Sequence, residues 1–126
     1  MSRFLRFCVV GGAAFFVDAG VLMALTAGAG LDPYLARVIS FLAAATFTWW
    51  LNRSYTFELR REPTGSEWAA YVALMTLGAV VNYGTYAAAI TWWPIAREHL
   101  WIGVALGSVA GLGINFLTSR RLLNST

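Results

Sequence analysis

One carboxylate interrupts the first long apolar stretch of this chain, and one arginine lies near the start of the second. Asp18 lies about two-thirds of the way along residues 4–27, and Arg37 lies one turn into residues 34–51. A lipid-exposed charge costs several kcal/mol, so Asp18 must face protein or water. It serves either a substrate, proton or ion site, or a structural hydrogen bond between helices. For Arg37 the readings are snorkelling toward the headgroups, a phosphate contact, or an ion pair with Asp18.

A second polar and aromatic group ends the stretch 34–51, and it reads Asn52-Arg53-Ser54-Tyr55-Thr56-Phe57. Arginine offers a planar fork for phosphate oxygens, and an aromatic side chain suits the membrane interface. The group therefore predicts a phosphate headgroup contact through Asn52, Arg53 and Tyr55. An ordinary interfacial anchor is the alternative.

Three more polar residues complete the set of candidate binding residues. Asn82 lies in a third apolar stretch, 68–93, and is expected to pack between helices or to bond with Asp18. Asn115 and Arg120 lie near the end of a fourth stretch, in places related to the polar group just described. The chain has no phosphate-binding glycine loop, catalytic triad or Cys/His cluster. We therefore expect no catalytic residue, metal or cofactor.

Four apolar stretches position these residues, and they span 4–27, 34–51, 68–93 and 100–117. Each is near the ~20 residues that a helix needs to cross a bilayer. Of the 126 residues 59% are hydrophobic and only 12% are charged, whereas soluble domains carry about a quarter. The sequence predicts an all-α membrane protein, with residues 1–126 forming a single domain of four transmembrane helices. A cleaved signal peptide is disfavoured for the first stretch, which is longer than a ~7–15 residue signal core.

The arginines orient the helices. Seven of the nine basic residues fall on one side, namely Arg3, Arg6, Arg53, Arg60, Arg61, Arg120 and Arg121. The positive-inside rule then places both termini and the connection 53–67 in the cytoplasm. A formal charge of +3 is too small to indicate nucleic acid binding. At the helix starts, Asp32 and Pro33 are expected as cap and first residue of the second helix, and Ser66 as cap of the third.

The two halves of the chain align when Phe7 is placed over Tyr71, since Asp18 then falls on Asn82. The order of such landmarks predicts two related two-helix hairpins, a parallel repeat about an axis along the membrane normal. Chance similarity of apolar helices is the alternative. Glycines recur at fourfold spacing in the last stretch, at Gly103, Gly107 and Gly111. They permit close helix contact, either within the chain or in a homodimer.

Several segments resemble GtrA-like proteins, and these are Arg6-Phe7-Cys8-Val9-Val10-Gly11-Gly12, Asp18, Ala36-Arg37-Val38-Ile39-Ser40-Phe41 and Leu51-Asn52-Arg53-Ser54-Tyr55-Thr56-Phe57. The sharpest element is the Asn-Arg-x-Tyr-x-Phe motif at the end of the second helix. The resemblance covers nearly the whole chain. The second half departs from the family pattern, because Leu122 and Leu123 stand where the repeated motif has aromatic residues.

The resemblance implies a flippase that moves an undecaprenyl-phosphate-type, polyprenyl-phosphate-linked sugar from the inner to the outer leaflet of a bacterial inner membrane. The sugar would modify O-antigen, teichoic acid or similar envelope glycans. A glycosyltransferase partner would charge the lipid on the inner face, and the chain itself would not be an enzyme. Arg53 and Arg120 at the inner end, Asp18 and Asn82 midway, and Arg37 near the outer end would line the polar path. Because four short helices enclose little volume, we expect a homodimer.

Two other functions fit the same pattern. Small proton-coupled multidrug exporters also have four helices and one carboxylate in the first, although basic groups at the helix ends repel a cationic drug. A membrane scaffold would recruit a glycosyltransferase through its cytoplasmic loop.

Overall fold

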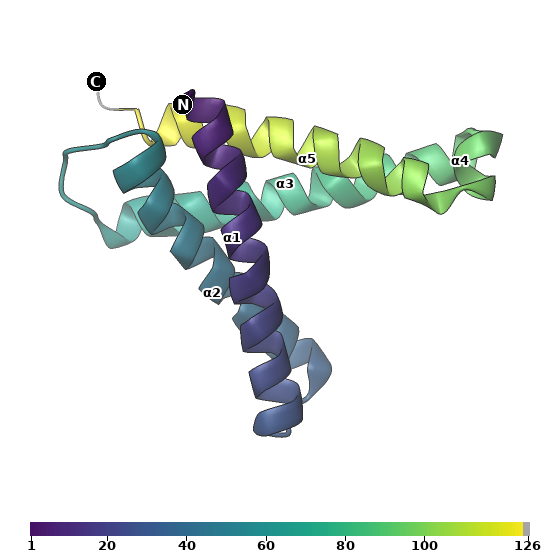
Figure 1. Cartoon of the computed structure of the whole chain (residues 1–126), viewed down its shortest axis with the longest axis horizontal. Coiled ribbons are helices and arrows are strands. Elements are labelled where there is room, and N and C mark those ends of the chain that lie inside the picture. Colours follow the sequence, from purple (N-terminus) through teal and green to yellow (C-terminus); the bar gives the residue numbers. More distant parts are fainter. Residues whose placement is uncertain (125–126) are drawn as a thin grey trace. The chain divides into compact units, whose positions relative to one another are not determined.

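The computed structural model describes residues 1–124 of the chain. Helices and π-helical turns follow one another in the order α1 (Arg3–Met23), η1 (Ala24–Gly28), α2 (Pro33–Leu51), η2 (Asn52–Thr56), α3 (Gly65–Trp92), α4 (Pro94–Glu98) and α5 (Leu100–Leu122) (Figure 1). Within this range, four helical segments are long and apolar enough to cross a membrane. The prediction of an all-α membrane protein with four membrane-spanning helices is confirmed.

The helix starts show one correct cap prediction and one wrong one. Asp32 accepts a backbone N–H bond at 3.1 Å and Pro33 is the first residue of α2, as expected. Ser66, expected to cap the third helix, lies inside its first turn. Thr64 has that role, because its hydroxyl accepts the backbone N–H of Glu67 at 3.0 Å.

The second residue after each π-helical turn has a left-handed backbone. Gly30 follows η1 with a φ of 71°, and Glu58 follows η2 with a φ of 51°. A backbone N–H just after each turn then bonds to a carbonyl six residues earlier, one residue further than the corresponding bond of a Schellman ending. The connection expected over residues 53–67 is therefore shorter, since η2 is helical to Thr56 and α3 starts at Gly65.

The described residues form two compact units. Unit 1 comprises Met1–Val72 with the residues from Leu123 onward, and unit 2 comprises Ala73–Leu122. The boundary between the units lies inside α3. Unit 1 thus contains the α1–α2 hairpin and the start of α3, and unit 2 contains the rest of α3 beside α5 (Figure 1). The parallel repeat and the cytoplasmic termini stay predictions.

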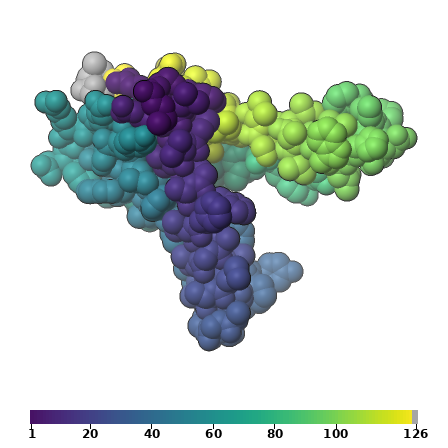
Figure 2. Space-filling model, in the orientation of Figure 1, coloured from purple at the N-terminus to yellow at the C-terminus, as the bar shows by residue number. Residues whose placement is uncertain are grey.

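In the α1–α2 hairpin, α2 buries small residues, whereas α1 exposes several large apolar ones. In α2 the buried positions Ala36, Ser40 and Ala44 recur every four residues, which places them on one face. Large apolar side chains are exposed on α1, at Phe4, Leu5, Val9, Phe15, Phe16 and Met23. Figure 2 shows α1, in purple to blue, as a continuous ridge on the surface of unit 1. An apolar surface of this extent suits contact with lipid.

Candidate functional site

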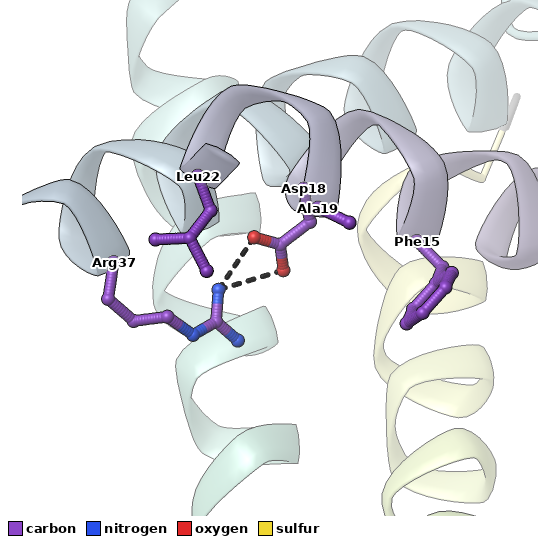
Figure 3. Close-up of a pocket in the computed structure, with 5 residues that line it drawn as sticks. All are labelled: Phe15, Asp18, Ala19, Leu22 and Arg37. Atoms are coloured by element: carbon purple, nitrogen blue, oxygen red, sulfur yellow. Dashed lines mark hydrogen bonds and ion pairs between the residues drawn. The ribbon is translucent and has the colours of Figure 1, made fainter. Parts of the chain in front are cut away.

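Asp18 of α1 and Arg37 of α2 form an ion pair across the first hairpin (Figure 3). Nη1 of Arg37 lies 2.6 Å from Oδ1 and 2.8 Å from Oδ2 of Asp18. The same nitrogen donates to Oγ of Ser40 at 3.1 Å, while the hydroxyl of Ser40 donates to the carbonyl of Arg37 at 3.0 Å. The sequence left three readings for Arg37, and the ion pair with Asp18 is confirmed.

The guanidinium of Arg37 reaches into the hairpin. From Asp18 to Gly28 the helix rises about 15 Å, whereas Arg37 lies only about 6 Å from the start of α2, at ~1.5 Å per residue. To meet Asp18, the side chain of Arg37 extends deeper than its own Cα. Snorkelling would turn it the other way, toward the headgroups. A carboxylate in an apolar helix offers Arg37 a stronger partner, since neither charge is then left unpaired.

The ion pair lines an open pocket of about 270 Å³ in unit 1. Its other walls are the apolar side chains of Phe15, Ala19 and Leu22, all on α1. The side chain of Asp18 is 24% exposed and that of Arg37 is 56% exposed. The pocket therefore joins an apolar wall to a cation that remains accessible from outside the hairpin.

A second ion pair is buried where η2 meets the start of α3. Nε of Arg53 lies 2.7 Å from Oε1 of Glu67, and both side chains are only 5% exposed. Glu67 also accepts the indole N–H of Trp49 at 2.9 Å and Nε of Arg61 at 3.2 Å. Nη2 of Arg53 donates to the carbonyl of Arg61 at 2.7 Å. Arg53 thus already has a protein counter-anion, and its contact with a phosphate stays a prediction.

Asn52 belongs to a buried hydrogen-bond network. Its side-chain N–H donates to the hydroxyl of Tyr71 at 2.9 Å, and that hydroxyl donates to Thr48 at 2.9 Å. Thr56 donates to the side-chain oxygen of Asn52 at 2.7 Å, across one turn of η2. These bonds satisfy the amide inside the protein, which explains why a polar side chain with 1% exposure is tolerated there.

Tyr55 is part of the contact between the start of α1 and the end of η2. Its side chain is 39% exposed, and the guanidinium of Arg6 lies 5.1 Å from its ring centre. Arg6 also donates to the carbonyl of Tyr55 at 3.0 Å and to the carboxylate of Glu58 at 2.7 Å. The ring is therefore held at a surface that carries an arginine.

In unit 2, Asn82 packs against the glycine ridge of α5. A Cβ atom on Gly107 would collide with the backbone carbonyl and the side chain of Asn82, and one on Gly111 would lie 3.0 Å from its Cβ. The ridge of Gly103, Gly107 and Gly111 thus serves packing within the chain, one of the two uses expected for it. Close helix approach of this kind needs residues without side chains.

Asn115 makes the opposite contact in unit 2, since here the asparagine is on α5 and the glycine is on α3. Its side-chain oxygen lies against Gly78 of α3, so closely that no Cβ fits there. Within residues 1–124 that oxygen and Oγ of Ser119 are buried without a hydrogen-bond partner. Arg120 is exposed, and its guanidinium lies 5.8 Å from the ring centre of Phe116. Among the described residues, Arg120 therefore has no buried ion pair like that of Arg53.

Gly107→Ala should destabilise the protein, because its new methyl group meets the backbone of Asn82, which cannot rotate away. We expect a loss of about 1–3 kcal/mol, the usual cost of overpacking. Thermal unfolding in detergent measures it. Gly113→Ala is the matched control, since a Cβ at Gly113 meets nothing within 4 Å. Equal unfolding midpoints for the two variants would show that α3 and α5 are not packed this closely.

Sequence reasoning missed Glu67, although it is the key acceptor of the buried cluster. An acidic residue in the first turn of a helix has an ordinary explanation, its favourable interaction with the helix dipole. Two signals were available in the sequence. Glu67 is one of few acids in the chain, and it follows three arginines in the connection expected over residues 53–67. Ser40 and Tyr71 were missed as well, because the sequence position of a hydroxyl group in an apolar helix does not indicate its hydrogen-bond partner.

The structure brings together some of the predicted binding residues. Asp18 meets Arg37, and Asn52, Arg53 and Tyr55 share η2. Asn82, Asn115 and Arg120 belong to unit 2. A family model described as the GtrA/DPMS transmembrane domain matches residues 6–124. That range includes every residue predicted to bind substrate.

Proposed function

Because this chain belongs to the GtrA/DPMS transmembrane-domain family, we propose that it is a flippase for a polyprenyl-phosphate-linked monosaccharide. Membership makes it a multi-pass membrane protein of a sugar-translocating family. The finer proposal is that the lipid-linked sugar passes from the inner to the outer leaflet and is then used to modify envelope glycans. The observation that carries it is the Asp18–Arg37 ion pair, set in a membrane hairpin beside an open pocket.

Translocation poses a specific physical problem. A phosphate and a sugar must cross about 30 Å of hydrocarbon while the prenyl chain stays in lipid. The polar group needs a cation and hydrogen-bonding partners at intermediate depth, open sideways to the bilayer. Arg37 supplies the cation, Asp18 keeps it neutralised in the absence of substrate, and apolar residues of α1 form the adjoining wall. A purely structural ion pair has no need of such exposure.

The setting that we propose follows from charge and family. Both termini and the arginine-rich connection lie in the cytoplasm of a bacterial inner membrane. A polyprenyl-phosphate glycosyltransferase supplies the charged lipid on that side. The chain acts as a transporter without catalytic residues of its own, and as a homodimer.

The exporter alternative is weakened by the partner of Asp18. Proton-coupled export of a cationic drug requires a carboxylate that is free to exchange a proton for the drug. In this structure the carboxylate is bonded through both oxygens to a guanidinium, which would repel a cationic ligand.

A transport assay tests the proposed function. Purified protein is placed in vesicles that contain a fluorescent undecaprenyl-phosphate-linked sugar, and a membrane-impermeant quencher reports the lipid exposed outside. We expect exposure of the inner-leaflet lipid to be at least about tenfold faster than in protein-free vesicles, a difference equivalent to ~1.4 kcal/mol in the barrier. Equal rates in the two kinds of vesicle would contradict the proposal. A labelled phosphatidylcholine serves as control for leakiness and nonspecific scrambling.

A further inference from the structure

Nη1 makes all the hydrogen bonds recorded for the guanidinium of Arg37 within residues 1–124. It donates to both carboxylate oxygens of Asp18 and to the hydroxyl oxygen of Ser40. Nε and Nη2 have no acceptor in that part of the chain, and the side chain is 56% exposed. In Figure 3 these two nitrogens lie on the side of the guanidinium away from the carboxylate. Arg37 thus has an unused edge with two N–H donors.

That edge has the geometry of a phosphate-binding group. The Nε and Nη2 N–H bonds of an arginine are nearly parallel and match two oxygens of one phosphate. Asp18 and Ser40 hold the third nitrogen, so the guanidinium is already oriented before a ligand arrives. A preoriented side chain loses less conformational entropy on binding. The ion pair therefore prepares Arg37 for an anion as well as neutralising it.

The surroundings of the edge indicate what kind of anion fits. Unpaired N–H groups in hydrocarbon cost several kcal/mol, so an acceptor there is strongly favoured. Phe15, Ala19 and Leu22 give the same pocket an apolar wall. A ligand that carries a phosphate and a hydrocarbon chain satisfies both parts of the pocket. Free inorganic phosphate satisfies only the first.

We propose that the Nε/Nη2 edge of Arg37 binds the phosphate of an anionic lipid, with the lipid chain along the apolar wall of α1. The inference rests on the proposed function, which it deepens by assigning the phosphate contact to one edge of one residue. Two lipids offer this chemistry, a polyprenyl phosphate and an ordinary anionic phospholipid. The substrate of the proposed flippase is the first.

Arg37→Lys tests the edge, because lysine keeps the positive charge and can pair with Asp18 but has no fork. Binding of undecaprenyl phosphate to the detergent-purified full chain is measured by native mass spectrometry. We expect the affinity of Arg37→Lys to fall at least about tenfold. The matched control is Arg97→Lys, in α4, whose affinity should equal that of the wild type. Unaltered binding by Arg37→Lys would overturn the proposal.

A second measurement on the wild-type chain does not depend on the folding of a variant. Undecaprenyl phosphate with a photoreactive group beside the phosphate should label peptides that contain Phe15 or Leu22. Labelling confined to other segments would overturn the site. Added phosphatidylglycerol distinguishes the two lipid sources. Weak competition supports the polyprenyl phosphate, whereas competition at equal concentration assigns the edge to ordinary phospholipid and rules out a substrate-selective site.

The two proposals fail in different ways. If the wild type binds the lipid phosphate through Arg37 but does not move the labelled glycolipid, the site stands and the flippase function fails. If the wild type moves the glycolipid while Arg37→Lys binds and labels like the wild type, the function stands and the site fails.

Discussion

Glu67→Gln is expected to cost about 3–5 kcal/mol of stability, the usual result of breaking a buried ion pair by removing one partner. Glutamine is nearly the same size, so the loss reflects charge. The side chain of Arg53, which is 5% exposed, would lose its counter-anion, and Arg61 would lose its carboxylate partner. Equilibrium unfolding of the detergent-solubilised protein measures the difference.

Two comparisons make this prediction specific. Glu62→Gln removes an exposed acid from the connection between η2 and α3 and should change stability by less than about 0.5 kcal/mol. The double variant Arg53→Met, Glu67→Gln should be more stable than Glu67→Gln alone, because no unpaired buried charge remains. If Glu67→Gln unfolds like the wild type, the cluster is not what fixes the connection to the helices.

Asp18→Ala is expected to slow glycolipid translocation by at least about tenfold, a change equivalent to ~1.4 kcal/mol in the barrier. Without the carboxylate, Arg37 is no longer held in the hairpin, and its long side chain is free to turn toward the headgroups. The vesicle assay described above measures the rate. Asp18→Glu should recover part of it, since a longer carboxylate can still reach Nη1.

The double variant Asp18→Ala, Arg37→Ala separates a structural role from a transport role. It removes both members of the ion pair, so neither charge is left without its partner and the unfolding midpoint should approach that of the wild type. Translocation should nevertheless stay low, because the cation for the phosphate is gone. Glu98→Ala, which removes an exposed acid at the end of α4, is the control and should transport normally. Wild-type transport by the double variant would reduce the ion pair to a packing feature.

The number and nature of the helices followed from the sequence because the membrane imposes simple conditions. A stretch of about 20 apolar residues must be helical in hydrocarbon. Asp32 and Pro33 mark the start of α2 through local chemistry alone. The end of this helical segment was harder to predict from the sequence, because η2 continues past Leu51. It is held by a side-chain bond from Thr56 to Asn52 and by backbone bonds from Phe57 and Leu59 to carbonyls of η2. Propensity does not report such contacts.

Contacts in the candidate site were easier to predict where charged residues are few. Few charges occur in the apolar stretches, so Asp18 and Arg37 had few alternatives as partners, and the structure joins them. Several arginines and acids lie near Arg53 in the sequence, and nothing in their spacing identified Glu67 as its ion-pair partner. Asn82 was expected to pack or to bond with Asp18, and its contact with Gly107 and Gly111, which shows packing, could not be read from the sequence.

The sequence alone determined that this is a four-helix membrane protein of the GtrA type, with a carboxylate and an arginine in its first two helices. Length, hydropathy and motif can be read from the chain itself, and an apolar segment in hydrocarbon must form a helix to satisfy its backbone hydrogen bonds. Only the tertiary structure decided which nitrogen of Arg37 meets Asp18 and which edge remains open. That depends on the register of α1 against α2, to within the few ångströms over which a hydrogen bond forms or fails.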